Sequence, residues 1–175
     1  MLNLHLIPKT DLFLRGLMST HYSTPRGFVG RSLCYKVFFN GVCYGAIVAG
    51  SATLHLPGAR PTNLNAIVNN AFYSISKRRG YDPRRNFTSH VIENFVDVAR
   101  VDWERFYGDR VVRFETLIEP PRTGELYRRA GWFRVGETKG FTCKRIAGEG
   151  SDSWSGSRVW DTKNLRPKLV WALDV

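Results

Sequence analysis

The sequence predicts an α+β fold in which a mainly antiparallel sheet is flanked by helices. Two segments of alternating apolar residues, 33–39 and 42–48, are joined by Asn40-Gly41, a pair that favours the tight turn of a β-hairpin. Apolar residues recur at helical spacing over 91–103. Hairpins and helices are mixed without regular strand–helix alternation, which argues against a parallel α/β sheet. A length of 175 residues is typical of one domain, expected here over 1–175.

The N-terminal half is expected to begin with a short helix. Thr10-Asp11 supplies a cap ahead of apolar residues at 12–14 and 17–18, although Gly16 weakens the helix. A loop at 21–27 ends it, the hairpin follows, and a second loop is expected at 57–65, where two prolines and a glycine occur. Residues 66–76 fit a strand or a helix, because their periodicity does not decide between them.

The C-terminal half is expected to start with a cationic loop and a long amphipathic helix. Asn86, Thr88 or Ser89 would cap that helix. The later elements are expected in this order: a strand at 111–118, an interruption at 119–122, two helical turns at 123–130, a strand from 132, a flexible loop rich in Gly and Ser at 148–157, and a C-terminal extension at 158–175 with a strand at 168–173.

The charge of the chain points to a polyanionic partner. Lys and Arg number 26 against 15 Asp and Glu, giving a formal net charge of +11. Such an excess of cations is typical of proteins that bind nucleic acid. At 43% hydrophobic residues the chain has enough apolar material for a core, so intrinsic disorder is not expected.

The cysteines and histidines predict neither a disulfide framework nor a metal site. The three cysteines form no Cys-x-x-Cys pair, and four histidines are scattered along the chain. No run of 18 apolar residues and no signal-like N-terminus occurs. We therefore expect a cytoplasmic protein that does not enter a membrane.

Two segments carry residues suited to chemistry. The loop at 77–86 holds five cations and leads into a helix N-terminus, an arrangement that favours a phosphate of a cofactor or of nucleic acid, although a solvated basic loop has the same composition. Glu119 follows a predicted strand directly, where a carboxylate is well placed to accept or deliver a proton. A simple turn-forming acid before Pro120 is the alternative.

The segment 127–136 reads Tyr-Arg-Arg-Ala-Gly-Trp-Phe-Arg-Val-Gly. It resembles the Tyr-x-x-Ala-x-Trp-x-x-x-Gly segment of the Mom family of phage DNA-modification proteins, and the Tyr-x-x-x-Gly-Phe stretch of the broader GNAT N-acyltransferase superfamily. Mom proteins have Asp-Pro and then Gly upstream, where this chain has Glu119-Pro120 and Gly124. The acid is therefore Glu where the family has Asp. A family of phage-defence proteins has a similar Tyr-x-x-Ala-x-Trp segment.

Two further places agree with the resemblance, which spans Ser19 to Gly140. His21-Tyr22-Ser23 is similar to the family's His-Tyr-Ser start, and 86–89 is similar to the Asn-x-x-Ser stretch that opens its central helix. GNAT proteins hold a pyrophosphate at that helix. The superfamily's usual Gln/Arg-x-x-Gly-x-Gly/Ala signature is absent, which argues against ordinary acetyl-CoA binding.

The resemblance implies a GNAT-like transferase that modifies the exocyclic amine of adenine in double-stranded phage DNA, adding a carbamoylmethyl-type group that protects against restriction. A base inside a duplex must be flipped out, stacked on aromatic rings and held by cations on its phosphates. The residues expected to meet the nucleic acid are Tyr22, Trp132, Arg78 and Arg79, with Tyr81 and Phe133 as further stacking candidates.

The resemblance also suggests catalytic roles. Glu119 would act as general base toward the amine or would position it, and Tyr127 would donate a proton to the leaving group. His21 is a further catalytic candidate. Ser89, a candidate catalytic residue as well, would hold the group donor together with Arg84, Arg85 and Asn86. The donor itself stays open between acetyl-CoA and another activated compound.

Two other functions fit the same sequence. One is a GNAT acyltransferase that acts on an amine of a protein or small molecule, with the basic loop serving only its cofactor. The other is a non-catalytic DNA-binding or phage-defence protein, whose DNA affinity would survive the loss of Glu119 and Tyr127.

Overall fold

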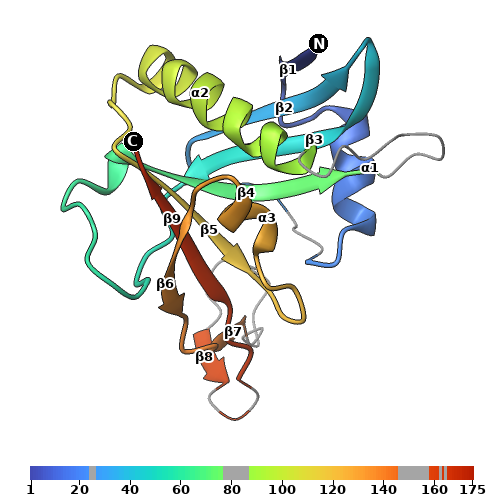
Figure 1. Ribbon diagram of the computed structural model, residues 1–175. Coiled ribbons are helices and arrows are strands. Elements are labelled where there is room, and N and C mark those ends of the chain that lie inside the picture. The colour runs from blue at the N-terminus through green and yellow to red at the C-terminus, as the bar shows by residue number, and fades with distance from the viewer. Residues whose placement is uncertain (24–26, 77–86, 146–157, 162, 164) are drawn as a thin grey trace, which may run out of the picture.

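The computed structural model describes residues 1–23, 27–76, 87–145, 158–161, 163 and 165–175. Seven strands form one sheet in the order β1-β2-β3-β4-β5-β9-β6, and all neighbours are antiparallel except β4 and β5 (Figure 1). The strands of this sheet are β1 (Leu2–Ile7), β2 (Ser32–Phe39), β3 (Val42–Ser51), β4 (Ile67–Ile75), β5 (Arg113–Ile118), β6 (Phe133–Glu137) and β9 (Leu169–Asp174). The predicted α+β class is confirmed.

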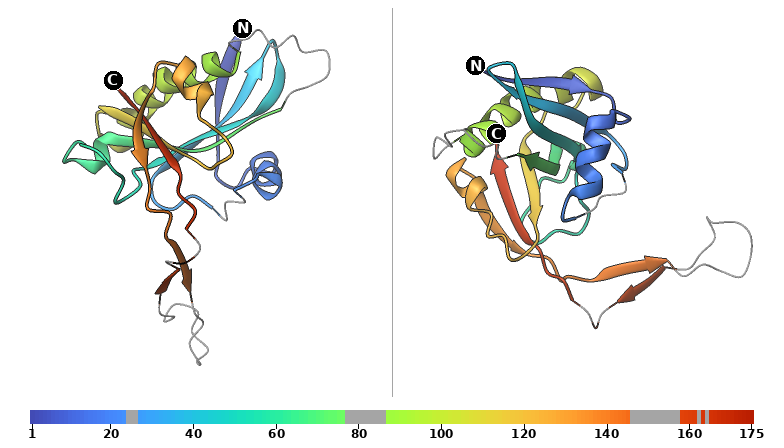
Figure 2. Two further views of the ribbon diagram at one scale, coloured as in Figure 1. Left: turned by 60° about the horizontal axis from the view of Figure 1, so that its bottom comes forward. Right: turned by 90° about the vertical axis from the view of Figure 1, so that its right-hand side faces the viewer.

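Helices cover both faces of the sheet (Figure 2). The long helix α2 (Phe87–Tyr107) buries Phe95 and Trp103 against one face, and α3 (Glu125–Arg129) packs on the same side. Helix α1 (Leu12–Thr20) buries Leu14 and Met18 on the other face. Alternate residues of β3 therefore enter opposite cores, Ile47 with α2 and Val48 with α1.

Local signals in the sequence account for the first half of the fold. The Asp11 carboxylate caps α1 by accepting a hydrogen bond from the Leu14 N–H at 3.1 Å. Asn40 and Gly41 both adopt positive φ, at 49° and 77°, as the tight turn of the β2–β3 hairpin requires. Residues 67–75 are a strand, which settles the open choice at 66–76.

One strand was missed, and two of the three candidate caps of the long helix are excluded. The strand β1 was not expected, and it pairs with β2 along its whole length. Helix α2 begins at Phe87, so Thr88 and Ser89 lie inside the helix and do not cap it. Asn86, the third candidate cap, lies outside the described residues, as do the predicted loop at 148–157 and the cationic loop from Lys77.

A two-stranded arm leaves the sheet between β6 and β9. It consists of β7 (Thr142–Arg145) and β8 (Arg158–Asp161), and it extends away from the body of the molecule (Figures 1 and 2). Its root is closed by two hydrogen bonds: the Thr138 N–H donates to the Lys168 carbonyl at 2.9 Å, and the Lys168 N–H donates to Thr138 Oγ1 at 3.0 Å. No described helix is long and apolar enough to span a membrane.

Candidate functional site

The parallel strands β4 and β5 diverge and open a pocket. Their ladder ends at the pair Asn70–Thr116, after which β4 continues beside β3 and β5 continues beside β9. A pocket of about 590 Å³ lies at this divergence. It is lined by 21–23 after α1, by 69–73 of β4, by 116–119 and 121–127, and by Lys168. Such a cavity between separating strands is a typical place for a ligand.

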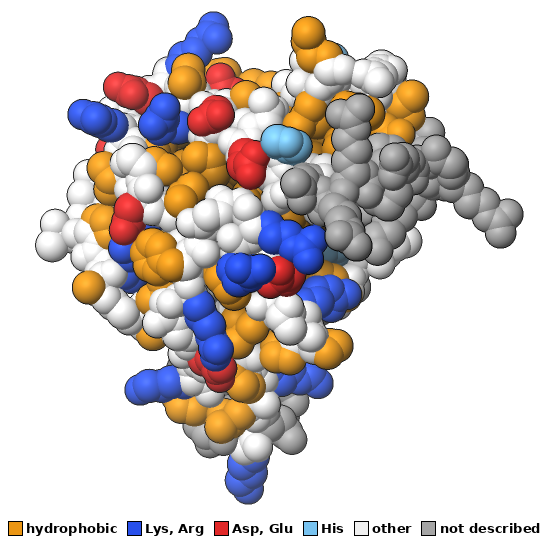
Figure 3. Space-filling view, viewed as in Figure 1, with side chains coloured by type: hydrophobic (Ala, Val, Ile, Leu, Met, Phe, Trp, Pro, Cys, Tyr) orange, Lys and Arg blue, Asp and Glu red, His pale blue; other side chains and the backbone are white. Residues whose placement is uncertain are grey.

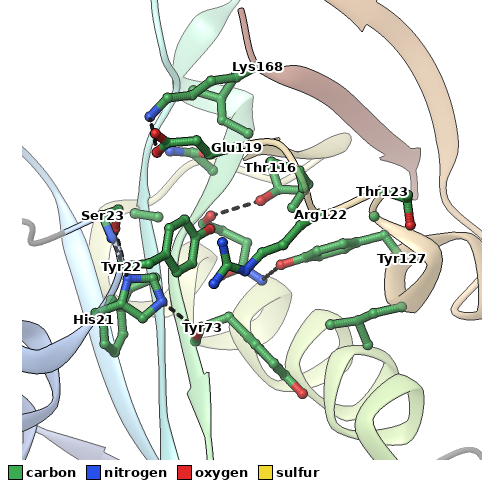
Figure 4. A pocket seen from close by; sticks show the side chains of 18 of the residues that line it. His21, Tyr22, Ser23, Tyr73, Thr116, Glu119, Arg122, Thr123, Tyr127 and Lys168 are labelled. Atoms are coloured by element: carbon green, nitrogen blue, oxygen red, sulfur yellow. Dashed lines mark hydrogen bonds and ion pairs between the residues drawn. The ribbon is translucent and has the colours of Figure 1, made fainter. Parts of the chain in front are cut away.

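Glu119 stands at the end of β5 on the pocket wall. Pro120 and Pro121 end the strand, and the Arg122 N–H closes the turn by donating to the Glu119 carbonyl at 3.2 Å. The Glu119 side chain is 29% exposed, and Lys168 Nζ lies 3.7 Å from its Oε2 (Figure 4). The carboxylate is therefore accessible from the pocket and has a cation beside it.

Tyr127 reaches the pocket from α3 and is 3% exposed. Asn70 Nδ2 donates to its hydroxyl oxygen at 3.0 Å, and Thr116 Oγ1 donates to the Asn70 carbonyl at 3.1 Å (Figure 4). Burial raises the pKa of Tyr127 above its ordinary value of about 10. The phenol therefore stays protonated, with the side chains of Asn70 and Thr116 as its hydrogen-bond partners.

His21 lines the pocket with both ring nitrogens engaged. Nδ1 accepts the Ser23 N–H at 3.3 Å and lies 2.8 Å from Ser23 Oγ, so Nε2 carries the proton that is donated to the Tyr73 carbonyl at 3.2 Å. Burial lowers the pKa of His21, which favours the neutral ring. These contacts hold the 21–23 segment on β4, and a catalytic role for His21 stays a prediction.

Tyr22, next to His21, is exposed at the pocket edge. Its ring lies 4.2 Å from that of His21, and the guanidinium carbon of Arg122 lies 3.5 Å from the centre of the Tyr22 ring. In Figure 4 the Tyr22 ring lies between these two groups. The described structure thus brings four predicted residues, Glu119, Tyr127, His21 and Tyr22, into one pocket.

The other predicted site residues are not gathered there. Trp132 is 3% exposed and packs edge-on against Tyr127 with ring centres 5.0 Å apart, so the expectation that it stacks on a base is wrong. Ser89 is buried in the first turn of α2 and does not line the pocket, and its role in donor binding stays a prediction. Arg78, Arg79, Arg84, Arg85 and Asn86 lie outside the described residues.

Sequence reasoning missed three pocket groups: Asn70, Arg122 and Lys168. The adjacent asparagines Asn69 and Asn70 within an otherwise apolar strand were a usable signal, because buried amides need partners. No local signal marks Arg122 or Lys168. Within the described part of the chain, no three His, Cys, Asp or Glu side chains are grouped as a metal site.

We expect Gly124→Ala to lower the free energy of unfolding by about 2–4 kcal/mol, because the strain of a positive φ and a steric clash add. Gly124 starts α3 with φ at +79°, and an added Cβ would lie 2.3 Å from Trp171 Nε1. Gly131→Ala is the matched control, since Gly131 has φ at +81° and open space within 4 Å. Urea unfolding measures both variants, and equal losses would contradict the predicted clash.

No protein-family model matches this sequence, and no curated protein sequence matches it significantly. Solved structures match it over nearly its whole length. An acetyltransferase of Bacillus subtilis in complex with CoA has a TM-score of 0.60 at 14% identity, covering 100% of this chain and 99% of that chain. A GNAT family acetyltransferase from Elizabethkingia anophelis with acetyl-CoA bound has a TM-score of 0.56 at 9% identity, covering 99% and 98%.

A third match is the aminoglycoside acetyltransferase AAC(6′)-Ib in complex with coenzyme A, with a TM-score of 0.56 at 12% identity over 99% of this chain and 95% of that chain. These similarities confirm the expected GNAT-like fold, and they do not address the Mom family. Together with the mostly antiparallel seven-stranded sheet and the diverging pair β4–β5, they show that the chain has the GNAT acetyltransferase fold.

Proposed function

We propose that this protein is a group transferase that modifies the exocyclic amine of adenine in DNA. The observation that carries the proposal is the pairing, in one pocket, of an accessible carboxylate at Glu119 with the buried phenol of Tyr127. A carboxylate can accept the proton that an attacking amine loses. A neutral O–H can donate a hydrogen bond to the negative charge that develops on a departing group.

The surface charge supports nucleic acid as the substrate. The net charge is +11, and the cations Arg122, Lys139 and Arg166 are exposed. Lys and Arg side chains predominate on the lower half of the face in Figure 3, towards the β7–β8 arm. A basic surface beside a pocket provides contacts to phosphates while one nucleotide enters the pocket.

In the proposed reaction the adenine amine attacks a donor carbon that carries a leaving group. The new N–C bond forms as the bond to the leaving group breaks, and the leaving group departs with the bonding electrons. Glu119 takes the surplus proton of the amine. The Tyr127 hydroxyl donates a hydrogen bond to the departing anion, which then takes a proton from solvent. An adenine amine is a weak nucleophile, so orientation in the pocket has to supply much of the rate.

Acyl transfer from CoA to another amine is the second candidate, because similar structures hold CoA or acetyl-CoA. The structure offers one group that fits CoA. Asn70 Oδ1 is buried beside the gap between β4 and β5, without a hydrogen-bond partner among the described residues. It would accept a hydrogen bond from an amide N–H of the CoA molecule. CoA would supply an activated acyl group.

Mass spectrometry of deoxynucleosides tests the proposal. The protein is expressed in a bacterial host, and the host DNA is digested and compared with DNA from cells that carry the empty vector. We expect a heavier deoxyadenosine only in cells that make the protein, and its added mass identifies the transferred group. Unmodified DNA from cells that contain folded protein would refute DNA modification, and tight CoA binding would then favour acyl transfer.

A further inference from the structure

At the mouth of the pocket, Arg122 stacks on Tyr22, and this contact holds the guanidinium only weakly. The Arg122 guanidinium covers the Tyr22 ring at 3.5 Å, and the Tyr22 residue is 44% exposed. In Figure 4 the Arg122 side chain extends between Tyr22 and Tyr127, towards the middle of the pocket. Arg122 therefore lies in the layer that a planar ligand stacked on Tyr22 would occupy.

No carboxylate neutralises Arg122 within the described part of the chain. The nearby Glu119 lies against Lys168 at 3.7 Å, and Glu125 is shared by Arg128 and Arg129 at 2.7 and 3.0 Å. A contact between an exposed guanidinium and an aromatic ring is weak, so it can be exchanged at little cost. A phosphate is a better partner for this cation, because it offers charge and bidentate hydrogen bonds.

We propose that Arg122 is a placeholder for the substrate base: an adenine flipped out of DNA takes its position on the Tyr22 ring, while the guanidinium turns outward to a DNA phosphate. This inference rests on the proposed function and names the residues that receive the base. Base-on-aromatic stacking is a general way of holding an unpaired nucleotide.

The rest of the pocket is consistent with a base in this position. Glu119 lines the same cavity and is the group proposed to meet the amine. Asn69 Oδ1 is buried on the β4 wall without a hydrogen-bond partner among the described residues, and it would accept an N–H of the adenine amine. His21 holds the segment that presents Tyr22, through its hydrogen bond to the Tyr73 carbonyl.

The first test measures modified deoxyadenosine in host DNA for variants of Tyr22. Tyr22→Phe keeps the ring and is expected to retain activity within about threefold. Tyr22→Leu removes the ring and is expected to lower modification tenfold or more, as the loss of one base-stacking contact predicts. Tyr22 is exposed, so both variants should fold, which thermal unfolding verifies.

The second test measures binding of purified protein to duplex DNA over a range of salt concentrations. Arg122→Leu is expected to reduce the slope of log affinity against log salt by about one, the value for one lost phosphate contact. Arg122→Lys should keep the slope, and Tyr22→Leu should leave it unchanged. Arg105→Leu is the matched control, because Arg105 also lies over an aromatic ring, that of Phe106 at 5.8 Å, away from the pocket.

Three outcomes would overturn the proposal that the base replaces Arg122 on Tyr22. Full modification by Tyr22→Leu excludes stacking on this ring. An equal loss in Tyr22→Phe and Tyr22→Leu shows that the hydroxyl matters and the ring does not. An unchanged salt slope in Arg122→Leu excludes the phosphate contact. In each case the unaltered protein still modifies DNA, whereas no modification by the unaltered protein refutes the proposed function and the placeholder with it.

Discussion

Replacing Glu119 by Gln is expected to lower the amount of modified deoxyadenosine by about 100- to 10,000-fold, the range that a general base contributes. Glutamine has the shape of glutamate but cannot take the proton of an attacking amine. The fold should tolerate the change, because Glu119 is 29% exposed and its contact with Lys168 spans 3.7 Å. A pair of this kind contributes at most about 1 kcal/mol to stability.

The control for Glu119→Gln is Glu93→Gln, which removes an exposed carboxylate from α2 outside the pocket. This variant should modify DNA at the level of the unaltered protein. DNA affinity is measured for both variants, because the loss in Glu119→Gln should appear in the rate and not in binding. Full activity of Glu119→Gln would exclude this carboxylate as the base.

Replacing Glu115 by Ala is expected to lower the free energy of unfolding by about 3–5 kcal/mol, the cost of breaking a buried ion pair. Glu115 is 2% exposed, and its carboxylate accepts two hydrogen bonds from Arg60, at 2.9 Å from Nε and 2.6 Å from Nη2. Arg113, itself bound to Asp174, lies 4.0 Å away. Without Glu115 the Arg60 charge would be buried and unpaired.

A second variant separates the lost pair from lost packing. Arg60→Met combined with Glu115→Leu removes both charges and keeps apolar volume, so it should recover most of the stability. Denaturant unfolding of the single and double variants measures this difference. A single variant within about 1 kcal/mol of the unaltered protein would show that the pair is not needed.

Local sequence determined the elements that could be predicted. The turn at Asn40-Gly41 and the cap at Asp11 are short-range signals, and both are found in the structure. The strand β4 was ambiguous because it is central and apolar on both faces, with Val68 in one core and Phe72 in the other. Strand β1 shows alternating leucines, but its place at the sheet edge follows only from its pairing with distant β2.

The candidate site was predicted in part, because only some of its residues carry a local pattern. Glu119 follows a strand and Tyr127 lies in a recognisable segment, so both stood out. Trp132 stood out equally but is buried, since its ring supports Tyr127 from within the core. The contact of Arg122 with Tyr22 joins two turns far apart in the chain, and only the fold brings them together.

The position of the β7–β8 arm has a consequence for how such proteins can diversify. The arm occupies the connection between β6 and β9, two strands that are neighbours in the sheet, and its root is closed at Thr138 and Lys168. Exchange of the arm beyond Thr138 and Lys168, with both of these residues kept, would therefore leave the sheet and the pocket residue Lys168 in place. The arm can thus change during evolution while the residues of the pocket stay the same. Chimaeras joined at this root would test whether the arm determines which partner is bound.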